Sequence, residues 1–336
     1  MARRRLRVDW FLVGILAAAV LASFLPARGI AIPVVDVATK VAVAGLFFVH
    51  GVRLHPREAL RGLTHWRLHL TILSFTYVAF PLIGLGLDAV LPRLINPTLA
   101  AGMLFLSLVP STVQSSIAFT SIAKGNVAGA IVSASASNLI GVVLTPLLTV
   151  ALMNVSGGAS VDPGSVIDIM AQILLPFVVG QVLRRWLAEW VARHPRLKLF
   201  DQASIVLVVY AAFSEGVREH MWQRVSLLDV AVLVAACVAI LVVMLTATWY
   251  LPGLARFTRA DRIAIQFCGT KKSLASGLPM ATVLFAGQDV GLLILPLMLF
   301  HQLQLMTCGW LAGRYGRSAP PEPELSDAPG RPTDPR

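Results

Sequence analysis

The sequence predicts an all-α, polytopic membrane protein whose ten transmembrane helices form two inverted five-helix repeats. Three observations predict this fold. Of the 336 residues, 57% are hydrophobic and only 13% are charged, whereas soluble domains carry about 25% charged residues. The apolar residues come in blocks of about 20, which is the length of a helix that crosses a bilayer. Weak sequence matches also recur between the two halves at nearly constant spacing.

Each apolar block is bounded by short polar or basic segments, so we expect one membrane-spanning helix for each block. The first block follows Arg3-Arg4-Arg5 and also suits a signal peptide. Its apolar run is long for that role, and its removal would leave nine spans, so we interpret it as a span. The ten expected spans cover residues 9–27, 32–51, 68–91, 98–123, 127–152, 165–187, 200–218, 227–251, 261–285 and 288–312.

The positions of the basic residues predict the orientation of these spans. With the N-terminus in the cytoplasm, 21 of the 28 Lys and Arg residues fall in cytoplasmic segments and four fall on the opposite side. The other three, Lys40, Lys271 and Lys272, lie inside spans. The positive-inside rule therefore places both termini in the cytoplasm and explains the net charge of +11 without a nucleic-acid partner. We expect the lipid bilayer as partner, and the Ala-, Leu- and Arg-rich composition favours a bacterial inner (plasma) membrane.

The internal repeat divides the chain into two halves. Because each half has an odd number of spans, the second copy must insert upside down, and inverted repeats of this kind mark many secondary transporters. The matched segments are residues 50–55, 112–115 and 125–129 in the first half and residues 215–220, 270–273 and 287–291 in the second. The expected organisation is a cytoplasmic N-terminus (1–8), a first five-helix repeat (9–152), a second five-helix repeat (165–313) and a disordered cytoplasmic tail rich in Pro and acidic residues (318–336).

Two of the expected spans contain helix-breaking residues at matched positions. Span four holds Pro110 and then a polar run that ends at Ser116, and span nine holds Gly269, Gly277 and Pro279. A broken helix frees backbone groups, which a membrane tolerates only where they face protein or a wet cavity. In inverted-repeat proteins such breaks mark the binding site near the midplane. The alternative is that these residues only kink and pack the helices, since Gly and Pro are common in transmembrane helices.

Several motifs resemble one known family. The segments Leu46–Val52, Trp66–Leu70 and Phe267–Leu274, the Gly125-Asn126 turn, and His301 with Gln304 resemble the SBF-like branch of the bile acid:sodium symporter superfamily. The resemblance covers roughly residues 9–313. It implies a mobile core domain (spans 3–5 and 8–10), a panel domain (spans 1–2 and 6–7) and alternating access between the two. It also implies that the broken helices 4 and 9 cross at their unwound centres.

The chain departs from the sodium-coupled members of that superfamily. Those members carry a Glu-x-Gly-x-Gln-Asn motif in span nine, whose glutamate helps to bind sodium. Here Phe267 stands at the glutamate position and Lys271-Lys272 stands at the Gln-Asn pair. Ser115 and Ser116 keep oxygen ligands for a candidate sodium ion, whereas two further ligand positions in span five fall on alanines. Two cations beside such a site would repel sodium, so coupling to sodium or to protons stays open.

The two adjacent lysines in span nine need compensation, because a charge at the bilayer centre costs about 2.5–3.5 kcal/mol on insertion scales. They can donate hydrogen bonds to freed half-helix carbonyls and to Gln114. They can release a proton, since an apolar surrounding favours the neutral amine, or they can bind an anionic substrate. Alternatively they only hold the crossing together. In span two, we expect Asp36 to satisfy Lys40 one turn away.

Polar residues of two symmetry-related spans extend the candidate site. His301 and Gln304 lie one turn apart on one face of span ten, and Asn138 falls at the matching depth of span five. They can line the site or relay protons, or they can be structural. The expected substrate- or ion-binding residues are Thr112, Gln114, Ser115, Ser116, Asn138, Thr270, Lys271, Lys272, Ser273, His301 and Gln304.

These features favour a secondary active transporter of an organic anion or related small solute. The sequence has no HExxH metal motif, no GxSxG elbow and no pair of midplane aspartates, so we expect no enzyme, no metal site beyond the candidate sodium ion and no other cofactor. A channel fits the inverted repeat less well. The alternative function is a non-transporting regulator of membrane ion (calcium) homeostasis, because the SBF-like branch that the chain resembles includes members suspected of influencing calcium handling.

Overall fold

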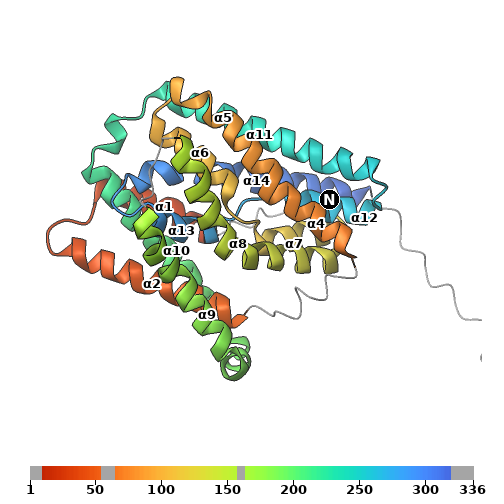
Figure 1. Ribbon diagram of the computed structural model, residues 1–336, viewed down its shortest axis with the longest axis horizontal. Helices are drawn as coiled ribbons and strands as arrows, with labels where there is room; N and C mark the ends of the chain where they lie inside the picture. The colour runs from red at the N-terminus through yellow and green to blue at the C-terminus, as the bar shows by residue number, and fades with distance from the viewer. Residues whose placement is uncertain (1–9, 54–64, 157–162, 319–336) are drawn as a thin grey trace, which may run out of the picture.

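A computed structural model describes residues 10–53, 65–156 and 163–318, and these ranges are built of helices without strands (Figure 1). The expected N-terminal segment 1–8 and residues 319–336 of the expected tail lie outside the described residues. The first half of the chain contains α1 (Trp10–Phe24), α2 (Ala31–Arg53), α4 (Trp66–Ser74), the π-helix η2 (Phe75–Ala79), α5 (Phe80–Asp88), the 3₁₀-helix η3 (Leu91–Arg93), α6 (Pro97–Leu108), α7 (Val113–Ile122) and α8 (Val127–Ser156).

The second half of the chain is helical as well. It contains α9 (Pro163–Arg193), α10 (Leu197–Arg218), the 3₁₀-helix η4 (Met221–Gln223), α11 (Leu227–Leu254), α12 (Arg259–Gly269), α13 (Leu274–Leu284) and α14 (Val290–Arg317). Side-chain caps fix several of these starts. Asn96 accepts a hydrogen bond from the Thr98 N–H at the start of α6, and Thr258 accepts one from the Asp261 N–H at the start of α12.

The helices are those of an integral membrane protein. In the described ranges six helical segments are long and apolar enough to cross a membrane, and the α6–α7 pair, which bends by 62° at its break, makes a seventh. The other helices are shorter or more polar. α1 has 15 residues, and the first turn of α12 carries three charged side chains, Arg259, Asp261 and Arg262. The expected count of ten spans therefore stays a prediction.

The described helices pack in two groups. α2 and α9 lie against each other along much of their length, and α10 joins α2 to α1. Figure 1 shows α2 and α9 side by side at the lower left, whereas α5 and α11 lie along the upper side. The second group, α4 to α8 with α11 to α14, holds most of the buried apolar side chains, and α9 and α10 contact its α8, α13 and α14.

Two glycines allow the close approach of α2 and α9. A Cβ on Gly51 would collide with the Phe177 carbonyl oxygen, and a Cβ on Gly180 would collide with the Phe48 carbonyl oxygen. The contact is reciprocal, so the two backbones touch at the same level. Helices inside lipid have no hydrophobic driving force between them, and small residues at their contacts instead allow the two backbones to pack closely.

We predict that Gly51→Ala destabilises the protein. The added methyl group meets backbone rather than a movable side chain, so α2 and α9 must separate, at a cost of about 1–3 kcal/mol. The apparent melting temperature of the purified protein in detergent should fall by several degrees. Gly86→Ala in α5 is the control, because a Cβ there meets nothing within 4 Å. Equal melting temperatures for the two variants would contradict the prediction.

Candidate functional site

Helical geometry is interrupted inside both expected spans four and nine, at Val109–Thr112 between α6 and α7 and at Thr270–Ser273 between α12 and α13. Pro110 explains the first interruption, because it lacks an N–H and disfavours helical geometry in the residue before it. Val109 is accordingly extended, with ψ of 156°. Only the start of the polar run expected to break span four is non-helical, since Val113–Ser116 already belong to α7.

The two interrupted segments are hydrogen-bonded to each other. The Ser273 N–H donates to the Pro110 carbonyl at 2.8 Å, which joins the two backbones directly. The Thr112 hydroxyl donates to the Lys272 carbonyl at 3.1 Å. Backbone groups that each break has freed are thus satisfied by the other break, as burial away from water requires. We call this contact the crossing.

Serine hydroxyls of the first break satisfy the end of α12. Ser111 Oγ donates to the Cys268 carbonyl at 2.6 Å, and Ser116 Oγ donates to the Phe267 carbonyl at 2.8 Å. These carbonyls lie in the last turn of α12, where no further helical N–H follows to bond them. Ser116, one of the two expected sodium ligands, is therefore engaged in holding the crossing.

Each of two long helices binds the crossing through a side-chain amide. Asn138 of α8 donates to the Ser111 carbonyl at 2.7 Å and accepts from the Ser276 hydroxyl at 2.8 Å. Gln304 of α14 clamps the Lys272 backbone from both sides, accepting from its N–H at 2.9 Å and donating to its carbonyl at 2.7 Å. The expected residues Asn138 and Gln304 thus support the two breaks in matching ways.

Lys272 is completely buried and is held by backbone carbonyls. Its Nζ donates to the carbonyls of Thr76, Ser107 and Val109 at 2.7–2.9 Å. It also lies 4.2 Å from the ring centroid of Phe80. Two of the three acceptors belong to the end of α6, where the helix dipole favours a cation. Of the expected roles for this lysine, the structure shows contact with half-helix carbonyls.

The π-helix at Phe75–Ala79 supplies the third acceptor. The Phe80 N–H bonds to the Phe75 carbonyl, so the next carbonyl, that of Thr76, would need the N–H of residue 81. Residue 81 is Pro81, which has no N–H. The Thr76 carbonyl is thereby left for Lys272. A π-turn followed by proline thus delivers a buried acceptor to the crossing.

Lys271 lies in a different environment from its neighbour. Its Nζ is buried and has no hydrogen-bond partner. It lies 3.7 Å from the ring centroid of Phe119 and 6.0 Å from that of Phe267, beside a small apolar cluster of α7, α12 and α14. Gln114, the expected partner of the lysines, is exposed in α7 and receives no bond from either ammonium.

Ser115 and Ser116 place two hydroxyl oxygens near the expected sodium site. Ser115 Oγ is buried without a hydrogen-bond partner, and Ser116 Oγ donates to the Phe267 carbonyl, which leaves its lone pairs free to accept. The matching positions in α8, Ala130 and Ala134, are buried and carry no oxygen. In the described ranges no cluster of three or more His, Cys, Asp or Glu residues could hold a metal.

The remaining expected residues complete the surroundings of the crossing. His301 is buried, and its Nδ1 lies 2.9 Å from Gln304 Nε2 and 3.3 Å from the Lys272 carbonyl oxygen. The Thr270 hydroxyl bonds back to Gln266 in its own helix, and the Ser273 hydroxyl caps α13 by accepting from the Ser276 N–H. The crossing therefore gathers all the expected residues except Gln114 into buried or half-buried positions.

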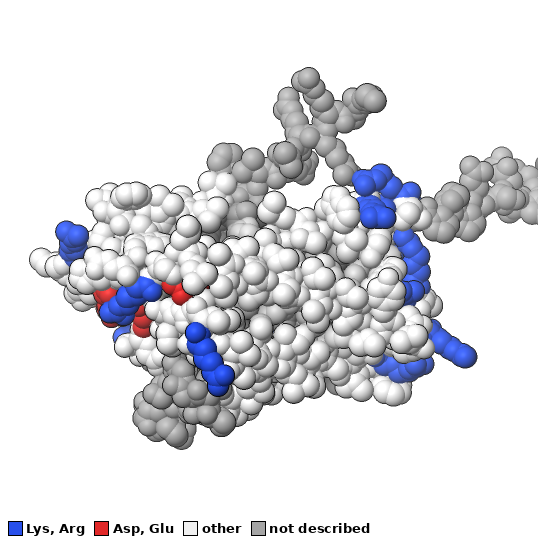
Figure 2. All heavy atoms as spheres, turned by 90° about the horizontal axis from the view of Figure 1, so that it is seen from above, with Lys and Arg blue, Asp and Glu red and all other residues white. Residues whose placement is uncertain are grey.

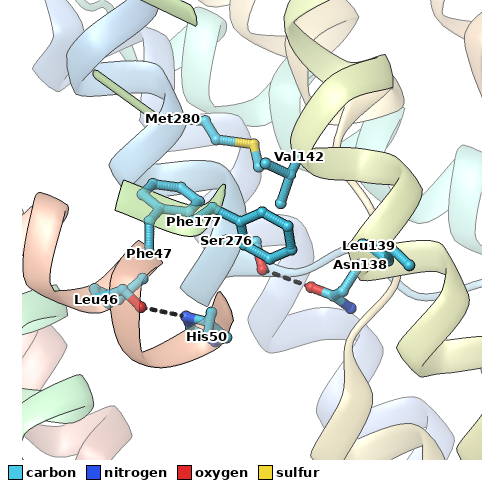
Figure 3. Close-up of a pocket in the computed structure, with 9 residues that line it drawn as sticks. All are labelled: Leu46, Phe47, His50, Asn138, Leu139, Val142, Phe177, Ser276 and Met280. Carbon is cyan, nitrogen blue, oxygen red and sulfur yellow. Dashed lines mark hydrogen bonds between the residues drawn. The ribbon is translucent and has the colours of Figure 1, made fainter. Parts of the chain in front are cut away.

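A small cavity lies between the two helix groups. It has a volume of about 30 Å³, enough for one water molecule. Figure 3 shows His50 of α2, whose Nδ1 bonds to the Leu46 carbonyl at 2.9 Å, on one side and the bonded pair Asn138 and Ser276 on the other. Sequence reasoning missed His50 as a site residue, although a histidine at the polar end of an apolar block was a usable signal.

A larger cleft lies farther along the same boundary. It has a volume of about 740 Å³ and is lined by α2, α9 and α10 on one side and by α13 and α14 on the other. Asp36, Lys40 and Glu215 are its charged lining residues. The expected ion pair between Asp36 and Lys40 is absent from the three pairs found in the described part of the chain, so that expectation was wrong.

The fold and the crossing define a class: a polytopic helical membrane protein with two interrupted helices and a cleft between helix groups. Within this class the chain belongs to the SBF-like CPA transporter family, whose model matches residues 9–317. The chain is 47% identical to an uncharacterized protein of Pseudomonas aeruginosa over 98% of its own length and 100% of that protein. It is 45% identical to a candidate symporter of Escherichia coli, YfeH, over 92% and 93% of the two chains.

A more distant relative links the chain to animal proteins. The chain is 30% identical to sodium/bile acid cotransporter 7-B of Xenopus laevis, with 90% of each chain covered. The resemblance seen in the sequence is thereby confirmed at the level of the family.

We predict that the two lysines differ in their effect on stability. Lys272→Met removes the donor from three buried carbonyls, and each unsatisfied group costs about 1–3 kcal/mol. Lys271→Met removes no hydrogen bond and leaves an apolar side chain against Phe119. In thermal unfolding of the purified proteins, the first variant should melt far below the second, which should melt near the wild type. The reverse order would show that Lys272 does not hold the crossing.

Proposed function

We propose that the protein is a secondary active transporter that moves a small organic solute across a bacterial inner membrane by alternating access. The observation that carries this proposal is the cleft between the two helix groups. A volume of about 740 Å³ lies within the range of small-molecule sites, about 300–1,000 Å³. The small cavity lies beside the crossing, because Asn138 and Ser276 line it.

The cleft and the small cavity support one solute route. Both lie between α2 and α9 on one side and α13 on the other. Along α2 the cleft is lined by Asp36 to Ala44 and the cavity by Leu46 to His50. The route is therefore wide at one end and nearly closed at the other. Movement of one helix group against the other would close the wide end of the route and open the narrow end. Such a change is what alternating access means.

Matched interruptions support ten spans in two inverted repeats. Each residue of the first break has a counterpart 161 positions later, so that Val109–Thr112 corresponds to Thr270–Ser273. α7 and α13 begin at Val113 and Leu274, at the same offset. The amides of Asn138 and Gln304 bind the corresponding residues Ser111 and Lys272. We propose that residues 9–152 and 165–313 are the two repeats, with α1, α2, α9 and α10 as panel and the other helices as core.

The distribution of charge supports cytoplasmic termini. Figure 2 shows a cluster of Lys and Arg at the right-hand end of this face, and Asp and Glu beside further Lys and Arg toward the left-hand end, with a largely uncharged band between them. The segments that the positive-inside rule assigns to the cytoplasm include Lys124, Arg256 and Arg317, at the ends of α7, α11 and α14. The wide cleft then opens toward the outside.

We propose protons rather than sodium as the coupling ion. An ammonium without an acceptor in an apolar cluster is costly, whereas a neutral amine is tolerated there. Lys271 can therefore take up a proton when water reaches it and release it when the cluster closes again. The membrane potential adds about 2.3 kcal/mol per charge per 100 mV to such a cycle. The solute in this proposal carries an anionic group that accompanies the proton.

We predict pH-driven uptake of organic anions that depends on Lys271. Liposomes with purified protein and an acid-outside gradient should accumulate at least one member of a panel of radiolabelled carboxylates, without any need for sodium. Lys271→Gln should lower this uptake at least tenfold while the protein keeps its melting temperature. Lys198→Gln, which changes an exposed lysine, is the matched control.

Other outcomes of this experiment identify the alternatives. Uptake that needs sodium and survives Lys271→Gln would mean that the lysine is structural and that hydroxyl and carbonyl oxygens suffice for sodium. No flux of any tested solute would favour the non-transporting regulator of membrane ion (calcium) homeostasis.

Topology gives an independent prediction. A cysteine introduced as Gln223→Cys, between α10 and α11, should react with an impermeant maleimide added outside intact cells. A cysteine introduced as Arg196→Cys, between α9 and α10, should react only after the membrane is opened. Both positions are exposed, and the three native cysteines are buried. The opposite labelling pattern would overturn the orientation, and labelling of both from outside would overturn the span between them.

A further inference from the structure

The large cleft has a mixed charge pattern that the crossing does not share. Asp36 and Lys40 lie one turn apart on α2, and Glu215 faces the same space from α10. In the described part of the chain none of these three side chains has an ion-pair partner within 4.0 Å. Three charged groups with unused bonding capacity thus face one space.

A buried hydroxyl adds an uncharged polar group to this lining. Thr39 is 8% exposed, its Oγ1 has no hydrogen-bond partner, and it lines the cleft beside Lys40. A buried polar atom without a partner is unfavourable unless a ligand or water supplies the bond. The rest of the lining is mostly small and apolar, including Val43, Ala211, Ala212, Val283 and Ala286.

The other cations near the cleft are already engaged. The Arg218 guanidinium donates to the Ala27 carbonyl at 3.0 Å, and that of Arg224 pairs with Asp289 at 3.4 Å. Lys271 and Lys272 are completely buried and do not line the cleft. Lys40 is therefore the one cationic side chain among the cleft-lining residues, against two carboxylates. A solute with negative charge alone would meet a lining whose net charge is negative.

We propose that this cleft binds a zwitterionic solute with an apolar body. Its ammonium group lies between the carboxylates of Asp36 and Glu215, its acidic group binds Lys40, and the Thr39 hydroxyl bonds to one of its polar atoms. The valine and alanine side chains hold the apolar body. The inference rests on the proposed function in that the cleft is the solute's entry site, and it narrows the organic anion to one that also carries a positive charge.

Three probes with one body test this charge preference. Phenylalanine is the zwitterion, phenylalaninamide is the cation and N-acetylphenylalanine is the anion. Leucine and its amide and N-acetyl forms give a second set with an aliphatic body. Binding to purified protein in nanodiscs is measured at mildly acidic pH, where the free amines are protonated. In each set the zwitterion should bind at least about tenfold tighter than the cation or the anion.

Variants then show which side chain binds which charged group of the zwitterion. Lys40→Gln should remove the advantage of the zwitterion over the cation, and Glu215→Gln should remove its advantage over the anion. Asp36→Asn repeats the second test should Glu215→Gln fail to fold. Lys198→Gln, at an exposed position outside the cleft, should leave all affinities unchanged.

Three results would overturn the proposal: tightest binding of an anion, equal binding of the three charge forms, or no binding of any probe. These failures are distinguishable from failure of the proposed function, which is judged by flux. A protein that binds N-acetylphenylalanine best and takes it up with protons would remain a transporter and would lack the zwitterion site.

Discussion

The structure depends on the need to satisfy backbone groups that two interrupted helices release inside an apolar protein. Lys272 meets much of this need alone, because its Nζ bonds to three carbonyls from α6 and from the π-helix before α5. Its own backbone is clamped by Gln304. A single residue thus fixes α6, the π-helix and α14 around the crossing. A hydrophobic replacement would leave the carbonyls unpaired where no water reaches them.

This network makes the second helix group a unit with few ways to deform. Direct bonds join the two breaks, as from the Ser273 N–H to the Pro110 carbonyl, and amides of α8 and α14 join the long helices to them. The cleft and the small cavity both lie along the boundary between the two groups. Since packed interiors shift between discrete arrangements rather than deform continuously, the boundary between the groups is the natural place for movement.

The adjacent lysines show how one sequence motif can serve two purposes. Successive residues of an extended segment point in opposite directions. Lys272 accordingly reaches the end of α6, whereas Lys271 reaches the ring of Phe119 on the other side. The first finds three acceptors and the second finds none. In the proposed mechanism the stable crossing therefore comes from one lysine and the exchangeable proton from the other.

The sequence by itself determined that the chain is helical and membrane-embedded, because block length and missing charge are local properties. It also located both helix breaks to within a few residues of their observed positions, because Pro and Gly act locally. Paired polar residues indicated nearly all the residues that surround the crossing. Only the tertiary structure decided which group bonds to which. Asp36 and Lys40 are one turn apart yet unpaired, Gln114 is exposed, and His50 faces α8. These outcomes depend on how helices distant in sequence pack against one another. The spacing of residues along a single helix carries no information about that packing.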